Sequence, residues 1–549
     1  MSRTLCVTLL LTTAFGSVLA DEIRPPEEKF EGEVVLQSET LKVIEGRTEV
    51  IVPRASVVCS EAFLFRYNNG DLLAATPTNR GKGGYRRSTD GGRTWHEIPE
   101  TLVREGGAAY QFPAPDSDVI SWPGSNVAPR VLRKPADPDG LWEYEVDFYR
   151  FASGGPTENR EKAVIHMPEA AILVPDHAIV RLDDGSLLAV CSTHLVRRGR
   201  NVSPVGHVTK WWLSYEFDKP HHLTKLRVFN GGDISAGLGI GDVEIYTTRD
   251  GARWNRVFEG RFRENPPGDD FPGVTYDIED SQTRQVVLEI HSNLGFRIGN
   301  IVQLGEIHFH ETGPDTKRSN YLRWPTEVVS VTASSAVSAK LLAENTVNGH
   351  GLQGERHTTA ESGMWQAHCA KNQTVVVRST DRGRSWTYLA TVADGDESLY
   401  PEGFCEPDLL VMPDGKVLCI LRTGGTICLN ESADGGKTWT PPREIPGFRG
   451  VWPNLVCTED GVVVAFAGRP DDWLTFSLDE GATWTTPIRV GGSNPQRGCD
   501  CTHYNGIVEV APDRLLAVYC RSVDPDDVEN GGPCTVDLVG TYFRVERKD

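Results

Sequence analysis

After its first twenty residues, the 549-residue chain has no apolar run long enough to cross a bilayer as a helix. It is also poor in positive charge, with 56 lysines and arginines against 76 acidic residues and a net charge of −20. The first absence disfavours a membrane-spanning protein. The second argues against nucleic acids and anionic membranes as partners, because their phosphates would be repelled.

Cysteine and histidine spacings typical of a zinc site are also missing. The nearest cluster, 499–503, has two cysteines and a histidine but lacks a second ligand pair, so we predict no metal there. One of the twelve cysteines lies in the first twenty residues, which leaves an odd number. Two pairs of cysteines lie on strands that we expect to be neighbours. Each pair could form a cross-strand disulfide or remain as buried free thiols, and both interpretations stay open. These pairs are Cys419 with Cys428 and Cys520 with Cys534.

Residues 1–20 are typical of a secretory signal peptide. Arg3 precedes an apolar segment from Leu5 to Phe15, and Ala20 ends a run of small and apolar residues before the acidic start at Asp21. We therefore expect an exported protein, either secreted or periplasmic.

One short unit, Ser-x-Asp-x-Gly-x-x-Trp, occurs four times, at 88–95, 379–386, 432–439 and 477–484. Each position suits a tight hairpin turn. The Ser and Asp side chains accept backbone N–H groups, glycine adopts positive φ, and tryptophan covers the turn. The unit is therefore interpreted as structural, and its aspartates as turn-forming rather than catalytic.

A second pattern, strand-turn-strand, runs in phase with the first. Its clear copies begin at Glu61, Asp176, Glu406, Trp452 and Tyr504. A weaker copy at 109–122 makes six units, and 538–545 supplies a closing strand. The sequence thus predicts an all-β fold, a six-bladed β-propeller with four strands per blade.

The third unit is interrupted, because its first half ends near Cys191 and its next strand begins only at Thr374. We expect propeller segments at 21–200 and 373–549, with an inserted β-sandwich at 201–372. Strand patterns between 212 and 309 resemble the later strands of a discoidin-type (jelly-roll-like) module, and 331–365 resembles its opening. That order implies a circular permutation. Two unrelated small β-units are the alternative.

The Asp-containing turns resemble the Asp-boxes, or BNR repeats, of the sialidase (neuraminidase) superfamily. Glu406 and Arg422 match, in spacing, the family's catalytic glutamate and one of its three carboxylate-binding arginines. Arg469 matches another of these arginines, and Tyr504 matches the tyrosine nucleophile. The resemblance implies that Glu406 is the base for Tyr504 and that the two arginines bind substrate.

Two positions depart from the family pattern. The first inner strand has 59–62 where the family has an arginine, and 78–85 contains no acid where the family has its acid/base aspartate. Asp176, Glu61 and His177 are the candidates for the general acid, because each is predicted at the central pocket. Arg80 and Arg521 are the candidates for the missing positive charge, with a surface location as the alternative.

These residues suit an acidic sugar, because arginines bind a carboxylate bidentately and a neutral tyrosine is not repelled by it. The sequence predicts an exo-glycosidase of sialidase type that releases sialic acid or a related acidic sugar from glycans. A catalytically silent, lectin-like propeller is one alternative. A lyase or another hydrolase of acidic polysaccharides is the other, because fold does not fix function.

No cofactor is expected for the propeller. The discoidin resemblance implies that the insert is an accessory glycan-binding module that could hold calcium. A rigid spacer, or a wall that shapes the rim of the pocket, is the competing interpretation.

Overall fold

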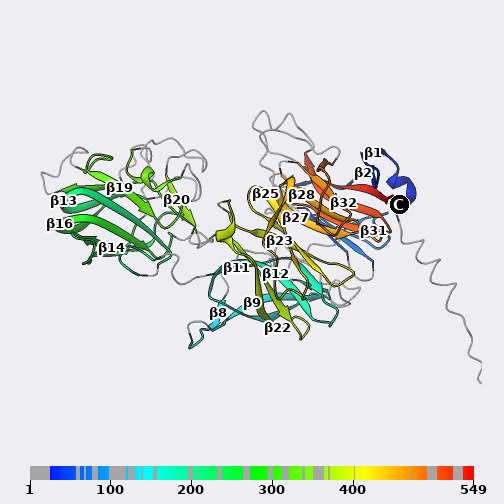
Figure 1. Ribbon diagram of the computed structural model, residues 1–549, viewed down its shortest axis with the longest axis horizontal. Coiled ribbons are helices and arrows are strands. Elements are labelled where there is room, and N and C mark those ends of the chain that lie inside the picture. Colours follow the sequence, from blue (N-terminus) through cyan, green and yellow to red (C-terminus); the bar gives the residue numbers. More distant parts are fainter. Residues whose placement is uncertain are drawn as a thin grey trace, which may run out of the picture.

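The computed structural model describes residues 25–56, 62–66, 70–76, 84–97, 119–121, 130–137, 140–151, 158–195, 202–207, 209–230, 238–263, 273–294, 301–311, 321–336, 341–349, 364–368, 371–400, 402–469, 471–490, 504–522 and 536–548. These residues form β-strands joined by turns and a few short 3-10 helices such as η1 (Glu27–Phe30) and η2 (Ala343–Thr346). The all-β prediction is confirmed (Figure 1). None of the helices that the structure describes has the length and apolar character needed to cross a bilayer. The predicted signal peptide lies outside the described residues.

Three sheets are four-stranded antiparallel meanders in which strand order follows the chain. The first contains β3 (Phe63–Arg66), β4 (Leu72–Thr76), β5 (Gly84–Ser88) and β6 (His96–Glu97). The second contains β23 (Cys405–Val411), β24 (Val417–Arg422), β25 (Thr426–Ser432) and β26 (Arg443–Arg449). The third contains β27 (Val451–Cys457), β28 (Val463–Gly468), β29 (Trp473–Ser477) and β30 (Ile488–Arg489).

A fourth sheet joins the two ends of the chain. Its order is β1 (Glu33–Gln37), β2 (Leu41–Ser56), β33 (Val536–Arg547), β32 (Arg514–Ser522) and β31 (Gly506–Ala511). The predicted closing strand therefore lies between β32 and the early strand β2, with antiparallel pairing on both sides.

The interrupted third unit is completed across the insert. β11 (Ala170–Arg181) and β12 (Leu187–Leu195) are followed in the sheet by β21 (Gln373–Ser379) and β22 (Ser385–Ala393). The outer edge of β22 pairs in parallel with β10 (Glu158–Met167), which pairs with β9 (Trp142–Phe151). β7 (Val119–Ser121) and β8 (Arg130–Arg133) also pair with β9. The described strands of the second predicted unit thus join this sheet instead of forming one of their own, because the free edge of β22 offers backbone groups for pairing.

The first strands of five units lie side by side. β11 contacts β23, β23 contacts β27, β27 contacts β31, and β31 contacts β3. The N–H of Ala62 donates to the carbonyl of Tyr504 at 3.1 Å, which links the last unit to the first. The beginnings of these strands therefore converge from sheets far apart in the sequence.

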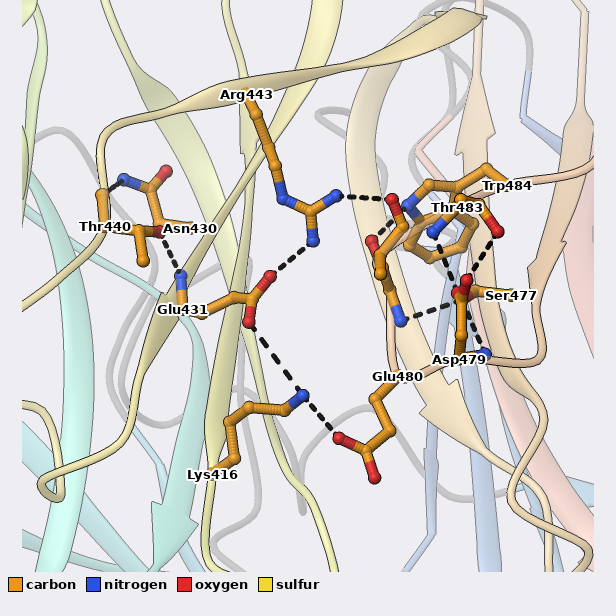
Figure 2. Close-up of polar contacts among 12 residues, drawn as sticks. Lys416, Asn430, Glu431, Thr440, Arg443, Ser477, Asp479, Glu480, Thr483 and Trp484 are labelled. Atoms are coloured by element: carbon orange, nitrogen blue, oxygen red, sulfur yellow. Dashed lines mark hydrogen bonds and ion pairs between the residues drawn. The ribbon is translucent and has the colours of Figure 1, made fainter.

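The repeated turns have the hydrogen bonds predicted for them (Figure 2). In the 477–484 copy, Ser477 Oγ accepts the Gly481 N–H at 2.7 Å and Asp479 Oδ1 accepts the Thr483 N–H at 2.8 Å. Trp484 Nε1 donates to the Gly481 carbonyl at 3.0 Å. In the 432–439 copy, equivalent bonds from Thr438 lower the pKa of Asp434 to about 2. The structural interpretation of these aspartates is confirmed.

Figure 2 also shows how the second and third meanders are joined at their surface. Lys416 lies between Glu431 of one sheet and Glu480 of the next, with Nζ 2.5 Å from the Glu480 carboxylate. Arg443 donates to Glu431 and to the Ala482 carbonyl. These contacts are exposed, so each contributes little to stability.

The disulfide interpretation is wrong for Cys419 and Cys428, because no disulfide joins these two buried side chains. The reason is strand register: Cys419 lies opposite Asn430, while Cys428 lies opposite Leu421. Cys520 is buried, and Cys534 lies outside the described residues.

A six-stranded sheet occupies residues within the predicted insert, apart from the other sheets (Figure 1). Its strands are β13 (Trp211–Phe229), β14 (Asp242–Thr248), β15 (Asn255–Arg261), β16 (Val274–Ile290), β18 (Glu306–Glu311) and β19 (Val328–Ala333). β17 (Ile301–Leu304) and β20 (Trp365–His368) form a separate pair. Early and late segments share one hydrophobic core, in which Trp211, Phe309 and Trp365 are buried. The module's exact boundaries and its discoidin class remain predictions.

Candidate functional site

The candidate site begins where strands β23 and β27 depart from regular geometry. Glu406 and Trp452, each the second residue of its strand, have positive φ angles of 46° and 51°. The register shifts between Cys405 and Asp408 in one strand, and at the corresponding place in the other. Residues with side chains adopt positive φ at a cost, and such positions cluster at functional sites. The irregularity therefore indicates that this end of the two sheets is a candidate functional site.

Three groups donate hydrogen bonds to the Glu406 carboxylate. Tyr504 Oη donates to Oε1 at 2.9 Å, and Arg422 Nη1 donates to the same oxygen at 2.6 Å. The backbone N–H of Trp452 donates to Oε2 at 2.9 Å. The Glu406 N–H in turn donates to Ser192 Oγ of β12 at 3.1 Å. Residues from four different sheets thus hold one carboxylate against one phenol.

Arg422 also contacts a second carboxylate, because its Nη2 lies 2.9 Å from Glu402 Oε2. Burial on its own would lower the pKa of Arg422, but the charges of Glu406, Glu402 and other neighbouring groups together outweigh it and the pKa is raised. The guanidinium therefore stays charged, and in this structure it fixes Glu406. Its buried Nε has no hydrogen-bond partner among the described residues.

Trp452 covers the Tyr504 ring. The two rings stack with centroids 4.3 Å apart and an interplanar angle of 17°. The phase of the repeat predicted that Trp452, Glu406 and Tyr504 occupy equivalent positions in their units. It could not predict that the Trp452 and Tyr504 rings stack. Aromatic stacking restricts the ring orientation, so Trp452 fixes the direction of the Tyr504 hydroxyl.

The other predicted site residues are described to different extents. Arg469 directly follows β28 with φ of 59°, and its Nε is buried without a hydrogen-bond partner among the described residues. The backbone of Asp176 and His177 lies in β11, at a register shift between Pro175 and Ile179. Their side chains lie outside what the structure describes, as do Glu61 and Arg80 altogether.

Arg521 lies near the end of β32, opposite Asp537 of β33. It is close enough to Tyr519 for its charge to act on that phenol. Burial raises the Tyr519 pKa to about 12, and the positive charge of Arg521 opposes this effect. The structure describes no contact between Arg521 and Glu406 or Tyr504.

Two buried carboxyl groups that sequence reasoning missed lie beside this site. Asp408 is 8 % exposed and accepts the Leu455 N–H at 2.7 Å and the Leu409 N–H at 2.9 Å. Burial raises the Asp408 pKa to about 7, although these hydrogen bonds oppose the shift. Asp472 is also buried, and burial together with the neighbouring Asp471 raises its pKa well above the ordinary value. The sequence signal for Asp408 was its place two residues after Glu406.

Comparison with known proteins supports the repeats. A family model described as a BNR repeat-like domain matches residues 315–520, which confirms BNR-type repeats in that part of the chain. A search of curated proteins gives no match.

Solved structures with detectable similarity differ in their stated roles. A protein of unknown function from Dyadobacter fermentans is 15% identical, with 92% of this chain and 99% of that chain covered and a TM-score of 0.35. The NanB sialidase from Streptococcus pneumoniae is 12% identical, with coverage of 95% and 71% and a TM-score of 0.31. A polysaccharide lyase, an ulvan lyase, is 9% identical, with coverage of 90% and 95% and a TM-score of 0.31. These similarities are too low to assign an activity.

Proposed function

We propose that this protein is an exported glycoside hydrolase of sialidase type that removes a terminal sialic acid or a related acidic sugar from glycans. The observation that carries the proposal is the hydrogen bond between Tyr504 and Glu406, with Arg422 on the same carboxylate oxygen. In this proposal the sheets are blades of a six-bladed propeller, and residues 201–372 are an inserted glycan-binding module. Export rests on the predicted signal peptide.

Tyr504 and Glu406 have the geometry of a nucleophile and its base. The phenol oxygen attacks the anomeric carbon while Glu406 Oε1, 2.9 Å away, takes the phenol proton. The bond from the anomeric carbon to the leaving oxygen breaks, and a general acid protonates that oxygen. Water then attacks the anomeric carbon of the glycosyl-tyrosine and gives a proton to the deprotonated general acid, while Glu406 returns its proton to the departing phenolate. Arg422 Nη1 stays 2.6 Å from the same Glu406 oxygen and orients it toward the phenol.

Arg469 is the proposed contact for the substrate carboxylate. A buried guanidinium N–H without an acceptor is costly, and its Nε has none among the described residues. A carboxylate oxygen from the substrate would satisfy it. Arg422, which already contacts Glu402 and Glu406, would reach the substrate only by giving up its contact with Glu402. Arg80 and Arg521 stay candidates for a further positive charge.

Asp176 is the first candidate for the general acid, followed by His177 and Glu61. The register shift in β11 corresponds to the one that presents Glu406 in β23, and the two strands are in contact. An Asp176→Asn variant with full activity would remove it from consideration and leave the other two.

A lectin-like protein is the second candidate function. It is favoured by segment 78–85, which contains no acid where the sialidase pattern has its acid/base aspartate. Binding an acidic sugar would require the arginines but no general acid.

The deciding experiment is release of free sugar from a fluorogenic α-sialoside and from a sialylated glycoprotein, with the first anomer identified by proton NMR. Glu406→Gln is expected to lower kcat by about 10²- to 10⁴-fold, and Tyr504→Phe to abolish turnover, while both keep the wild-type melting temperature. Tyr388→Phe, which removes a phenol bonded to Thr391 in β22, is the matched control and keeps full activity.

Each outcome distinguishes the candidates. The α-anomer as first product supports Tyr504 as nucleophile, whereas the β-anomer means inversion and overturns that role. Binding of sialic acid without release supports the lectin. Unsaturated products that absorb in the ultraviolet would identify a lyase.

A further inference from the structure

Two glutamates lie directly opposite each other in the sheet of the inserted segment. Glu244 of β14 pairs in register with Glu289 of β16, so both side chains project from the same face. Glu289 is only 1 % exposed. Like charges at opposed positions destabilise a sheet, and a buried carboxylate needs a compensating positive charge. Positive charge near the two carboxylates therefore stabilises this arrangement.

Two histidines contact the pair. His291 Nε2 lies 3.3 Å from Glu244 Oε2, and His207 Nδ1 lies 3.0 Å from Glu289 Oε2. The ligand atoms of Glu244, Glu289 and His291 all lie within 4.8 Å of one another. Oxygen and imidazole nitrogen atoms bound tetrahedrally to a common ion at about 2.0–2.2 Å would be about 3.3–3.6 Å apart, so small side-chain movements would bring these atoms to an ion.

The outer oxygens of both carboxylates are held by other groups. Glu244 Oε1 accepts a hydrogen bond from Arg256 Nη1 at 2.5 Å, and Glu289 Oε1 accepts one from Ser203 Oγ. Tyr246 Oη adds a bond to Glu244 Oε2 at 3.2 Å. One oxygen of each glutamate is thus fixed from outside while the other faces the imidazoles. Outer hydrogen bonds of this kind orient the ligands of metal sites.

We propose that Glu244, Glu289 and His291 bind one Zn²⁺ ion, and that His207, an exposed side chain that contacts Glu289 Oε2, moves in to complete the coordination. Two imidazoles with two carboxylates form a four-coordinate donor set typical of zinc. Calcium takes six to eight oxygen ligands. Two imidazole ligands therefore disfavour calcium, the ion expected for this module from its discoidin resemblance. Sequence spacing could not predict the site, because its ligands come from a loop and two strands.

Zn²⁺ at this site has a structural role. His207 and Ser203 belong to segment 202–207, which precedes β13, whereas Glu244 and Glu289 belong to β14 and β16 and His291 directly follows β16. The ion ties this segment to β14 and β16.

The test uses the full chain after dialysis against EDTA. Isothermal titration with ZnCl2 is expected to show one site, with a higher melting temperature at saturation, and Co²⁺ is expected to give the visible absorption of a tetrahedral complex. His291→Ala is expected to weaken Zn²⁺ binding at least about tenfold and to abolish the Co²⁺ spectrum. Glu289→Gln is a second ligand variant. Glu259→Gln, which removes another partner of Arg256 from the exposed face of β15, is the matched control and binds as wild type.

Zn²⁺ binding by His291→Ala and Glu289→Gln with wild-type affinity would locate the ion elsewhere and overturn the proposal. Stabilisation by CaCl2 but not ZnCl2 would overturn it too, as would the absence of any Zn²⁺ effect on the wild type. These readouts do not depend on sugar release. Failure of the zinc proposal can therefore be distinguished from failure of the proposed glycosidase activity.

Discussion

Replacing Asp408 with asparagine tests whether a carboxyl group buried between β23 and β27 controls stability near neutral pH. Its pKa of about 7 lies above the ordinary value of 3.8. Between about pH 4 and 7, the folded protein therefore holds a proton that the unfolded chain has released. The free energy of unfolding decreases as pH rises through this window, and above pH 7 this group has no further effect.

The magnitude follows from the two pKa values. At about 1.4 kcal/mol for each tenfold change in proton affinity, they correspond to roughly 4 kcal/mol lost between pH 4 and 7. Asparagine has no charge to bury, but its amide group can accept only one of the two N–H groups that Asp408 accepts. The lost bond costs about 1–3 kcal/mol. Asp408→Asn is therefore expected to be less stable than wild type at pH 4 and more stable at pH 8.

The assay is urea denaturation of both proteins from pH 4 to 8.5. The difference between their free energies of unfolding is the quantity to follow, because contributions from other groups cancel. Asp414→Asn, on the exposed turn of the same hairpin, is the control and should keep the pH dependence that Asp408 causes. A difference between wild type and Asp408→Asn that does not change with pH would refute the reasoning.

Three further substitutions test the site and the repeat. Trp452→Leu should lower kcat on the α-sialoside by about 2- to 10-fold while Trp452→Phe restores it. A change in KM alone would contradict the stacking role. Arg422→Met should lower the free energy of unfolding by about 3 kcal/mol, because it leaves Glu406 uncompensated, and an unchanged urea midpoint would argue against this. Asp479→Ala should cost about 1–2 kcal/mol in the same assay without affecting kcat, and a loss of kcat would contradict the structural role of these aspartates.

The repeated turns could be predicted because their hydrogen bonds are local. Ser477, Asp479 and Trp484 contact groups within a few residues along the chain, so the spacing alone indicates the conformation. The phase of the strand-turn-strand pattern likewise indicated that Glu406 and Tyr504 occupy equivalent strand starts. Both inferences depend on periodicity, which every copy of the repeat displays.

Contacts between distant segments could not be predicted in this way. Trp452 on Tyr504, Glu402 on Arg422 and the burial of Asp408 depend on how neighbouring sheets approach one another. The pairing of β22 with β10 and the placement of Cys419 opposite Asn430 depend on strand edge and register, and a shift of a residue or two changes both.

Local turn chemistry and the period of two in the strands thus made the all-β class, the structural aspartates and the strand starts at Glu406 and Tyr504 predictable from the chain alone. The folded structure alone brings the phenol, the carboxylate and the guanidinium together, and likewise Glu244, Glu289 and their two histidines. The physical reason is that hydrogen bonds within a turn need only a few neighbouring residues. Contacts across sheets depend instead on register, burial and packing, which the whole fold establishes at once.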